Sequence, residues 1–131
     1  MEGYSGTPLP RKLGVKPGHL VLVDGAPPDF TLATDGATVQ TRLGRGPYAV
    51  ALVFCPDRAR LERRWPRIAP RMTVDGALWI AWPKRASGVA TDLTEDVVRE
   101  VALARGLVDV KVCAVDETWS ALKLVTRLAD R

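Results

Sequence analysis

Residues 78–96 read LWIAWPKRASGVATDLTED, and this stretch joins a core strand to a well-marked helix start. It begins with an apolar run, and Pro83 then removes the backbone N–H that a continuing central strand would need. The basic pair Lys84 and Arg85 opens a loop of small and polar residues. The stretch therefore predicts a buried strand over residues 77–82, followed by a loop and a helix.

The start of that helix carries several capping signals. Asp92 and Glu95 have the three-residue offset of a capping box, with Asp in place of the usual Ser or Thr. Thr94 is a competing N-cap. Gly106 suits the left-handed position that follows many helices. We therefore expect a helix that begins after one of these caps and ends before Gly106.

Apolar runs and turn signals place the other elements on both sides of this stretch. The expected helical segments cover residues 8–13, 28–33 and 58 to about 65. Pro66 should kink or restart the last of these helices. The expected strands cover residues 19–23, 38–43, 48–55, 108–115 and 120–128, and a turn at residues 73–76 leads into the strand over 77–82.

The order of these elements predicts the fold class. Alternating helices and apolar strands favour parallel strands with helices on both faces, whereas the short connection between the last two strands favours an antiparallel pair. We expect one three-layer α/β domain over residues 1–131, with a mostly parallel sheet that ends in an antiparallel strand pair. Residues 1–6 are expected to form a flexible arm.

The composition excludes several classes of protein. With 131 residues, of which 47% are hydrophobic and 26% charged, the chain can fold without a disulfide or a structural metal. Cys55 and Cys113 lie far apart in or beside apolar runs, which is typical of reduced, buried thiols. No signal-peptide core occurs in residues 1–18, and no apolar run is long enough to span a membrane. We expect a soluble, cytoplasmic protein.

The formal charge of +4 and the pI near 9.4 raise the question of nucleic-acid binding, because Lys and Arg side chains neutralise phosphates. Six arginines lie between Arg58 and Arg71, mostly in one predicted helical segment, and we expect them to spread around its circumference. A solvated helix face is the favoured interpretation, and a nucleic-acid surface is the alternative.

From Tyr48 onward, the order of elements and the phrase DGALWI at residues 75–80 resemble the second half of a class I methyltransferase domain. The resemblance implies a reduced, Rossmann-type sheet whose last strand inserts in antiparallel sense. In that family a G-x-G-x-G turn holds the methionine part of S-adenosylmethionine, and an acidic residue after the second strand contacts the ribose. Residues 24–28 read DGAPP and residues 42–45 read RLGR, so we expect no cofactor binding in the family's way.

Phrases along the whole chain also resemble a bacterial family of small proteins described only as a domain of unknown function. They are SGTPL at 5–9, LGVKPG at 13–18, AWPKRASG at 81–88, TDLTEDVVRE at 91–100 and VDVKVCAVDETWS at 108–120. This resemblance implies no activity, substrate or site.

The rim outside the carboxyl ends of the strands is where open α/β sheets bind ligands. That rim should collect Lys84, Arg85 and Ser87 with the free backbone amides of the helix start near Thr94, a combination that would bind a small anion. The alternative is that the basic pair is solvated and that the residues near Thr94 only cap a helix.

Trp82 and Trp119 lie at strand ends beside polar residues. An indole in such a place can stack on a planar ligand or a cation. The alternative is that each ring is buried in the core and satisfies its one N–H there. Both tryptophans are therefore candidate ligand-binding residues.

No catalytic arrangement emerges from the remaining reactive residues. We interpret Asp116 and Glu117 as solvated turn residues, His19 as a structural residue at the start of a strand, and Cys55 as a buried thiol. We assign no catalytic residue, no metal ligand and no resident cofactor.

The sequence favours a non-catalytic binding or interaction module with a small anionic or phosphate-bearing ligand at the loop from Lys84 to Thr94. The alternatives are a methyltransferase-like enzyme with an altered S-adenosylmethionine pocket and a basic nucleic-acid accessory protein. Nucleic acid is the less favoured partner, and a homodimer through the edge segment at residues 38–43 is a further hypothesis.

Overall fold

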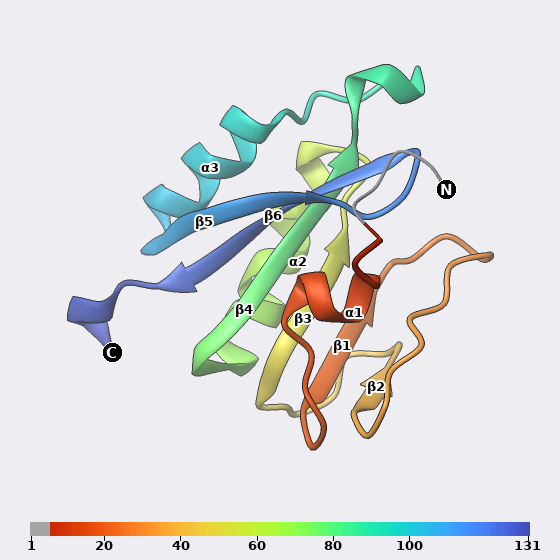
Figure 1. Ribbon diagram of the computed structural model, residues 1–131. Coiled ribbons are helices and arrows are strands. Elements are labelled where there is room, and N and C mark those ends of the chain that lie inside the picture. The colour runs from red at the N-terminus through yellow and green to blue at the C-terminus, as the bar shows by residue number, and fades with distance from the viewer. Residues whose placement is uncertain (1–5) are drawn as a thin grey trace.

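The computed structural model describes residues 6–131, which form an α/β domain around a six-stranded sheet (Figure 1). The strands are β1 (Leu20–Asp24), β2 (Thr38–Gln40), β3 (Tyr48–Phe54), β4 (Met72–Pro83), β5 (Leu107–Ala114) and β6 (Trp119–Thr126). Their order across the sheet is β2-β1-β3-β4-β6-β5. Apart from Gly6, the arm expected at residues 1–6 lies outside the described residues.

The sheet is parallel from β2 to β4, and β6 then pairs in antiparallel sense with both β4 and β5. The mostly parallel sheet that ends in an antiparallel pair is therefore confirmed. So is the insertion of the last strand beside β4, which the methyltransferase resemblance implied.

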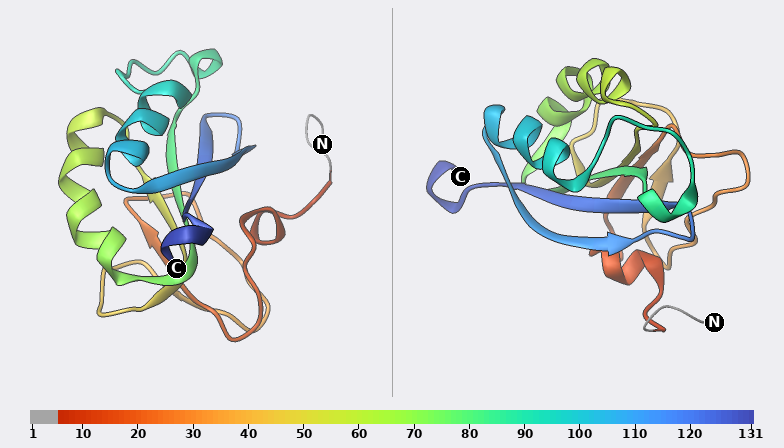
Figure 2. Two further views of the ribbon diagram at one scale, coloured as in Figure 1. Left: turned by 90° about the vertical axis from the view of Figure 1, so that its left-hand side faces the viewer. Right: turned by 90° about the horizontal axis from the view of Figure 1, so that it is seen from above.

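Helices cover both faces of the sheet, which gives the three expected layers (Figure 2). On one face, α2 (Arg58–Ile68) and α3 (Glu95–Ala104) enclose a core that contains Trp65 and Trp82. On the other face, the short α1 (Leu9–Leu13) covers a second core, where the Trp79 indole N–H donates to the Leu13 carbonyl at 3.1 Å. None of the helices in residues 6–131 is long and apolar enough to cross a membrane.

The central strand β4 is longer than the expected strand over residues 77–82, and the turn expected at residues 73–76 is wrong. The register between β3 and β4 shifts between Tyr48 and Val50, so the strand accommodates these residues in a bulge. A Cβ on Gly76 would lie 3.0 Å from the carbonyl oxygens of Tyr48 and Ala49. Gly76 therefore permits a close backbone approach and does not end the strand.

Two expected elements near the edge of the sheet differ from the structure. The helical turn expected over residues 28–33 is absent, and the strand expected over 38–43 ends at Gln40. The Tyr48 hydroxyl donates to Gln40 Oε1 at 2.6 Å and accepts from the Gly44 N–H at 2.7 Å. These bonds fold residues 41–47 into a loop, which ends the strand early.

The restart expected at Pro66 is wrong, because α2 runs through this residue to Ile68. The buried side chains of Leu61, Trp65 and Ile68 pack along one side of the helix, before and after this proline. The 3-10 turn η1 (Ala69–Arg71) then leads into β4.

Capping of α3 differs from the expected box. The Thr94 hydroxyl accepts from the Val97 N–H at 3.2 Å, so the competing cap is the one that forms. Asp92 instead accepts from the backbone N–H of Arg58 at 2.8 Å, at the start of α2. One loop residue therefore links the beginnings of two helices that are distant in sequence.

Candidate functional site at the carboxyl edge of the sheet

The carboxyl ends of β1, β3 and β4 meet at one edge of the sheet, because the three strands are parallel. The chain places β2 on one side of β1 and β3 on the other, so the strand order reverses between β1 and β3. Such a reversal point is where open α/β sheets bind ligands. Here it is formed by Asp24 and Gly25 after β1 and by the start of α2 after β3.

A buried ion cluster occupies this reversal point. Asp24 is 6% exposed, and its two carboxylate oxygens accept from Arg60 Nη2 at 3.0 Å and from Arg64 Nη2 and Nε at 2.9 and 3.0 Å. Arg60 also donates from Nε to the carbonyl of Phe54 at the end of β3. One carboxylate facing two guanidiniums leaves the cluster with a net positive charge.

The guanidinium of Arg60 lies directly over Gly25. A Cβ at Gly25, whose φ is +72°, would come within 2.4 Å of Arg60 Nη2. An arginine side chain therefore occupies the space directly next to Gly25. The residues present do not fit S-adenosylmethionine in the family's way, because the other glycines and the acidic residue after the second strand are missing as well.

A hollow of about 540 Å³ opens at the carboxyl ends of β1 and β2, on the α1 face of the sheet, and Gly25 is the lining residue that also lies next to Arg60. Its volume is within the range of small-molecule sites. Most of its wall is apolar, with the phenyl ring of Phe30 and the hydroxyls of Thr31 and Thr41 as its more distinctive groups. The lining consists of Val23, Gly25, Ala26, Pro27, Phe30, Thr31, Leu32, Val39 and Thr41.

An aromatic chain supports one wall of this hollow. The Phe30 ring meets the Phe54 ring edge to face at 5.0 Å, and Phe54 meets Trp119 in the same manner at 5.1 Å. Trp119 is half-buried within this chain, whereas Trp82 is buried in the core on the α2 and α3 face. A stacking role for Trp82 would therefore require its ring to leave the core.

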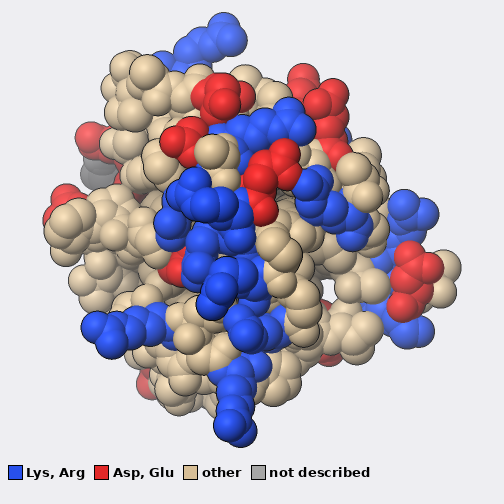
Figure 3. Space-filling model, turned by 180° about the vertical axis from the view of Figure 1, so that it is seen from behind, with Lys and Arg blue, Asp and Glu red and all other residues tan. Residues whose placement is uncertain are grey.

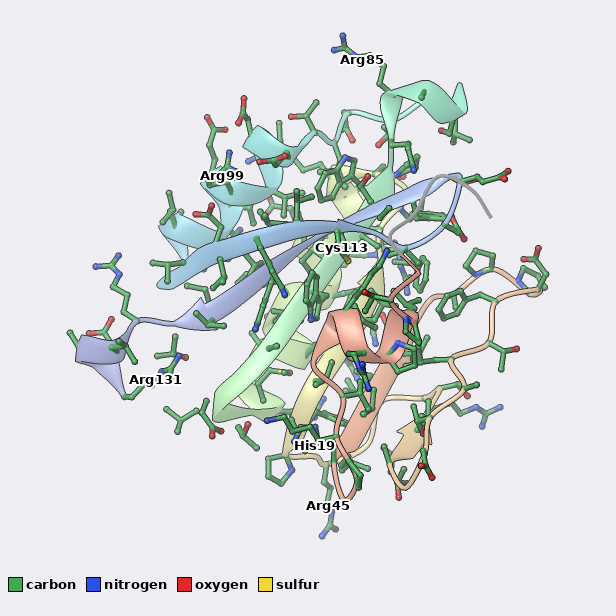
Figure 4. The ribbon with its side chains drawn as sticks, in the orientation of Figure 1. His19, Arg45, Arg85, Arg99, Cys113 and Arg131 are labelled. Carbon is green, nitrogen blue, oxygen red and sulfur yellow. The ribbon has the colours of Figure 1, made fainter. Side chains whose placement is uncertain are left out.

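The sequence-predicted anion residues lie on the rim, but they do not converge on one point. Arg85 is exposed and extends away from the sheet (Figure 4). The Ser87 hydroxyl donates to the Lys84 carbonyl at 2.7 Å within the turn η2 (Arg85–Ser87), and the Thr94 hydroxyl is used as a helix cap. The backbone N–H of Lys84 donates to the carbonyl of Thr118 at 2.8 Å, which brings the two rim loops together.

The remaining candidates have structural surroundings. Burial raises the pKa of the Cys55 thiol to about 12, although Arg60 lowers it in part, so the reactive thiolate is suppressed. Asp116 Oδ1 accepts from the backbone N–H groups of Thr118 and Trp119 and shapes the turn before β6. His19 lies at the opposite end of the molecule from Arg85 (Figure 4), where its Nδ1 accepts from the Lys16 N–H.

Sequence reasoning missed Arg60 and Arg64 as partners of Asp24. The available signal was an acidic residue that ends an apolar strand, together with two arginines four residues apart on a later helix. Nothing in the local sequence shows that the strand and the helix lie side by side.

Comparisons with known proteins find structures with a similar fold but no family to which the chain can be assigned. No family model and no curated protein matches the chain. The fold is similar to that of LepI. Its complex with S-adenosylmethionine has a TM-score of 0.51 and 18% identity, and a LepI variant with S-adenosylhomocysteine (SAH) and a substrate analogue has a TM-score of 0.51 and 19% identity.

A third similar structure, described as a pericyclic reaction enzyme, has a TM-score of 0.51 and 16% identity. Each comparison covers 91% of this chain and 39% of the other chain. At these identities the likeness establishes the methyltransferase-like fold alone.

Proposed function

We propose that this protein binds a nucleoside that carries an anionic group, in the hollow at the carboxyl ends of β1 and β2. The observation that carries the proposal is this hollow of about 540 Å³, whose lining includes Gly25, the residue that the Arg60 guanidinium of the Asp24–Arg60–Arg64 cluster covers. S-adenosylmethionine, its demethylated product and nucleoside phosphates all belong to this class of ligand.

The chemistry of the two neighbouring features matches the two parts of such a ligand. An apolar wall with one aromatic ring favours a planar base, and hydroxyls such as those of Thr31 and Thr41 can bond to a sugar. The side chains of Arg60 and Arg64 are 25% and 20% exposed, so their guanidiniums remain accessible to a carboxylate or phosphate.

The similar solved structures support the nucleoside part of the proposal. Two of them hold S-adenosylmethionine or SAH. This makes an S-adenosyl-type ligand a stronger candidate than the sequence suggested. Because Arg60 covers Gly25, the ligand would have to bind differently from the cofactor of a class I methyltransferase.

The proposal is tested by calorimetric titration and thermal shift with S-adenosylmethionine, SAH, AMP, adenosine and inorganic phosphate. Ligands that combine the base with an anionic end should raise the melting temperature more than adenosine or phosphate alone at the same concentration, and tighter ligands should raise it further. Ala26→Leu should fill part of the hollow and weaken binding, whereas Ala90→Leu, at an exposed loop position, should not. Equal affinities in both variants, or no binding by any nucleoside, would refute the proposal.

The loop from Lys84 to Thr94 is a second candidate site for an anion. It is favoured by the bond between the Lys84 N–H and Thr118, which joins this loop to the turn that carries Trp119. Against it, Glu95 and Asp96 in the first turn of α3 already supply negative charge to the helix start. Loss of phosphate or AMP binding in Lys84→Ala/Arg85→Ala, with binding retained in Ala26→Leu, would move the site to this loop.

A further inference from the structure

Most arginines of α2 lie on one side of the helix, which corrects the expectation that they spread around its circumference. Successive residues of an α-helix are about 100° apart, so Arg60, Arg63, Arg64 and Arg67 fall within an arc of about 100°. Arg58 lies on the opposite side with its partner Glu62. Figure 3 shows the result as a band of Lys and Arg side chains across the back of the molecule.

The band continues beyond the carboxyl end of α2. Arg71 ends η1, and its guanidinium donates to the carbonyl of Arg67 at 2.8 Å. A Cβ on Gly46 would lie 2.6 Å from the Arg71 carbonyl, so the loop that carries Arg45 is packed against this end. We call Arg60, Arg63, Arg64, Arg67, Arg71 and Arg45 the arginine stripe.

Few acidic groups offset this charge. Within residues 6–131, the ion pairs of the arginine stripe all involve Asp24. Its single buried carboxylate pairs with both Arg60 and Arg64. Glu62, the one acidic residue within α2, is paired with Arg58 and Arg105 on the far side. In the arginine stripe, Arg45, Arg63 and Arg67 are exposed, whereas Arg60, Arg64 and Arg71 are partly buried. A buried carboxylate anchors one end of the stripe.

We propose that the arginine stripe binds the sugar–phosphate backbone of double-stranded nucleic acid. Steps of three or four residues along a helix separate its guanidinium-bearing positions by about 4.5 to 6 Å, so several phosphates along one strand can be contacted together. Arginine also presents a planar fork of donors that matches phosphate oxygens.

A duplex fits this surface better than a single strand. Single-strand binding proteins pair basic grooves with aromatic rings on which bases stack. On α2 the aromatic residue is Trp65, which is 7% exposed and faces the core. The arginine stripe thus offers charge without a stacking surface, which suits backbone contacts and no reading of the bases.

The test is fluorescence anisotropy with a labelled duplex of mixed sequence, about 20 base pairs long, at several salt concentrations. Four phosphate contacts predict that log K falls against log salt with a slope of about −3.6, at −0.9 per contact. The stripe variant Arg63→Gln/Arg67→Gln/Arg71→Gln leaves the Asp24 cluster intact. It should bind at least about tenfold more weakly and flatten the slope by up to about 2.7.

A matched control is Arg85→Gln/Arg127→Gln/Arg131→Gln, which lowers the formal charge by the same three units at exposed positions outside the arginine stripe. Duplex affinity should remain within about threefold of the parent in this variant. The proposal is overturned if both triple variants lose affinity equally, or if the parent does not bind the duplex at low salt. It is also overturned if a single strand of equal length binds as tightly, or if polyglutamate competes as well as unlabelled duplex.

Discussion

Asp24 determines the arrangement of the candidate site, because its buried carboxylate fixes two arginines that arrive from a different element. Replacing it by Asn should leave two guanidiniums without a charged partner at a buried position. We expect Asp24→Asn to lower the free energy of unfolding by about 2 to 4 kcal/mol, less than for a fully buried pair because both arginines are partly exposed. Urea denaturation measures this loss.

Asp29→Asn is the control for that experiment, since Asp29 lies exposed in a turn. Its free energy of unfolding should stay within about 0.5 kcal/mol of the parent value. If both variants unfolded at the same urea concentration, the ion cluster would contribute little to stability.

Cys55 should make stability depend on alkaline pH. Burial raises the pKa of its thiol from 9.0 to about 12, so above pH 9 the unfolded chain loses a proton that the folded chain retains. The contribution of Cys55 is therefore fully present below pH 9 and declines as the pH rises toward 12, by up to about 1.4 kcal/mol per pH unit.

This dependence is measured as the difference between the parent and Cys55→Ala in urea titrations at about pH 8 and pH 10. The difference cancels the contributions of all groups that the parent and the variant share. The parent should lose more stability than the variant over this interval. Identical losses would mean that the folded thiol ionises like a free one.

At the scale of elements, Asp92 connects the loop before α3 to the start of α2. Asp92→Ala leaves the Arg58 N–H without this acceptor and should lower the free energy of unfolding by about 1 kcal/mol. Asp92→Asn keeps an acceptor oxygen and should retain most of this stability. Glu100→Ala, at an exposed position of α3, is a suitable control for helix content. Chemical denaturation distinguishes the three, and a neutral effect of Asp92→Ala would contradict the capping role.

The elements also show which structural features can be predicted from local sequence patterns. The Thr94 cap of α3 and the left-handed Gly106 after this helix agree with expectation, because helix caps depend on neighbours in the chain. The helix restart at Pro66 and the turn at residues 73–76 are wrong because packing against the sheet outweighs these local signals.

At the scale of the whole molecule, both sheet edges are poorly suited to pairing with a second copy. β2 has three residues, and β5 is interrupted by a register shift between Asp109 and Val112, with the exposed Lys111 inside it. Short edges, bulges and edge lysines all oppose strand pairing. We expect sedimentation to give a monomer of 14.3 kDa over a wide concentration range.

Lys111→Val should weaken this protection. It would join Val110 and Val112, which are 53% and 48% exposed, into a continuous apolar edge and favour self-association. The parent and the variant are compared by sedimentation velocity at matched concentrations. A dimer already present in the parent would contradict the expectation and restore the hypothesis of a homodimer.

The sequence by itself determined the α/β class, most strand positions, the Thr94 cap as one of two candidates and the antiparallel final pair, because each follows from residues close together in the chain. Only the tertiary structure decided which side chains meet at the carboxyl ends of the parallel strands. Asp24 is separated from Arg60 and Arg64 by 36 and 40 residues, and Asp92 from Arg58 by 34. Such contacts depend on which strand and helix are packed side by side, and no local periodicity encodes that choice.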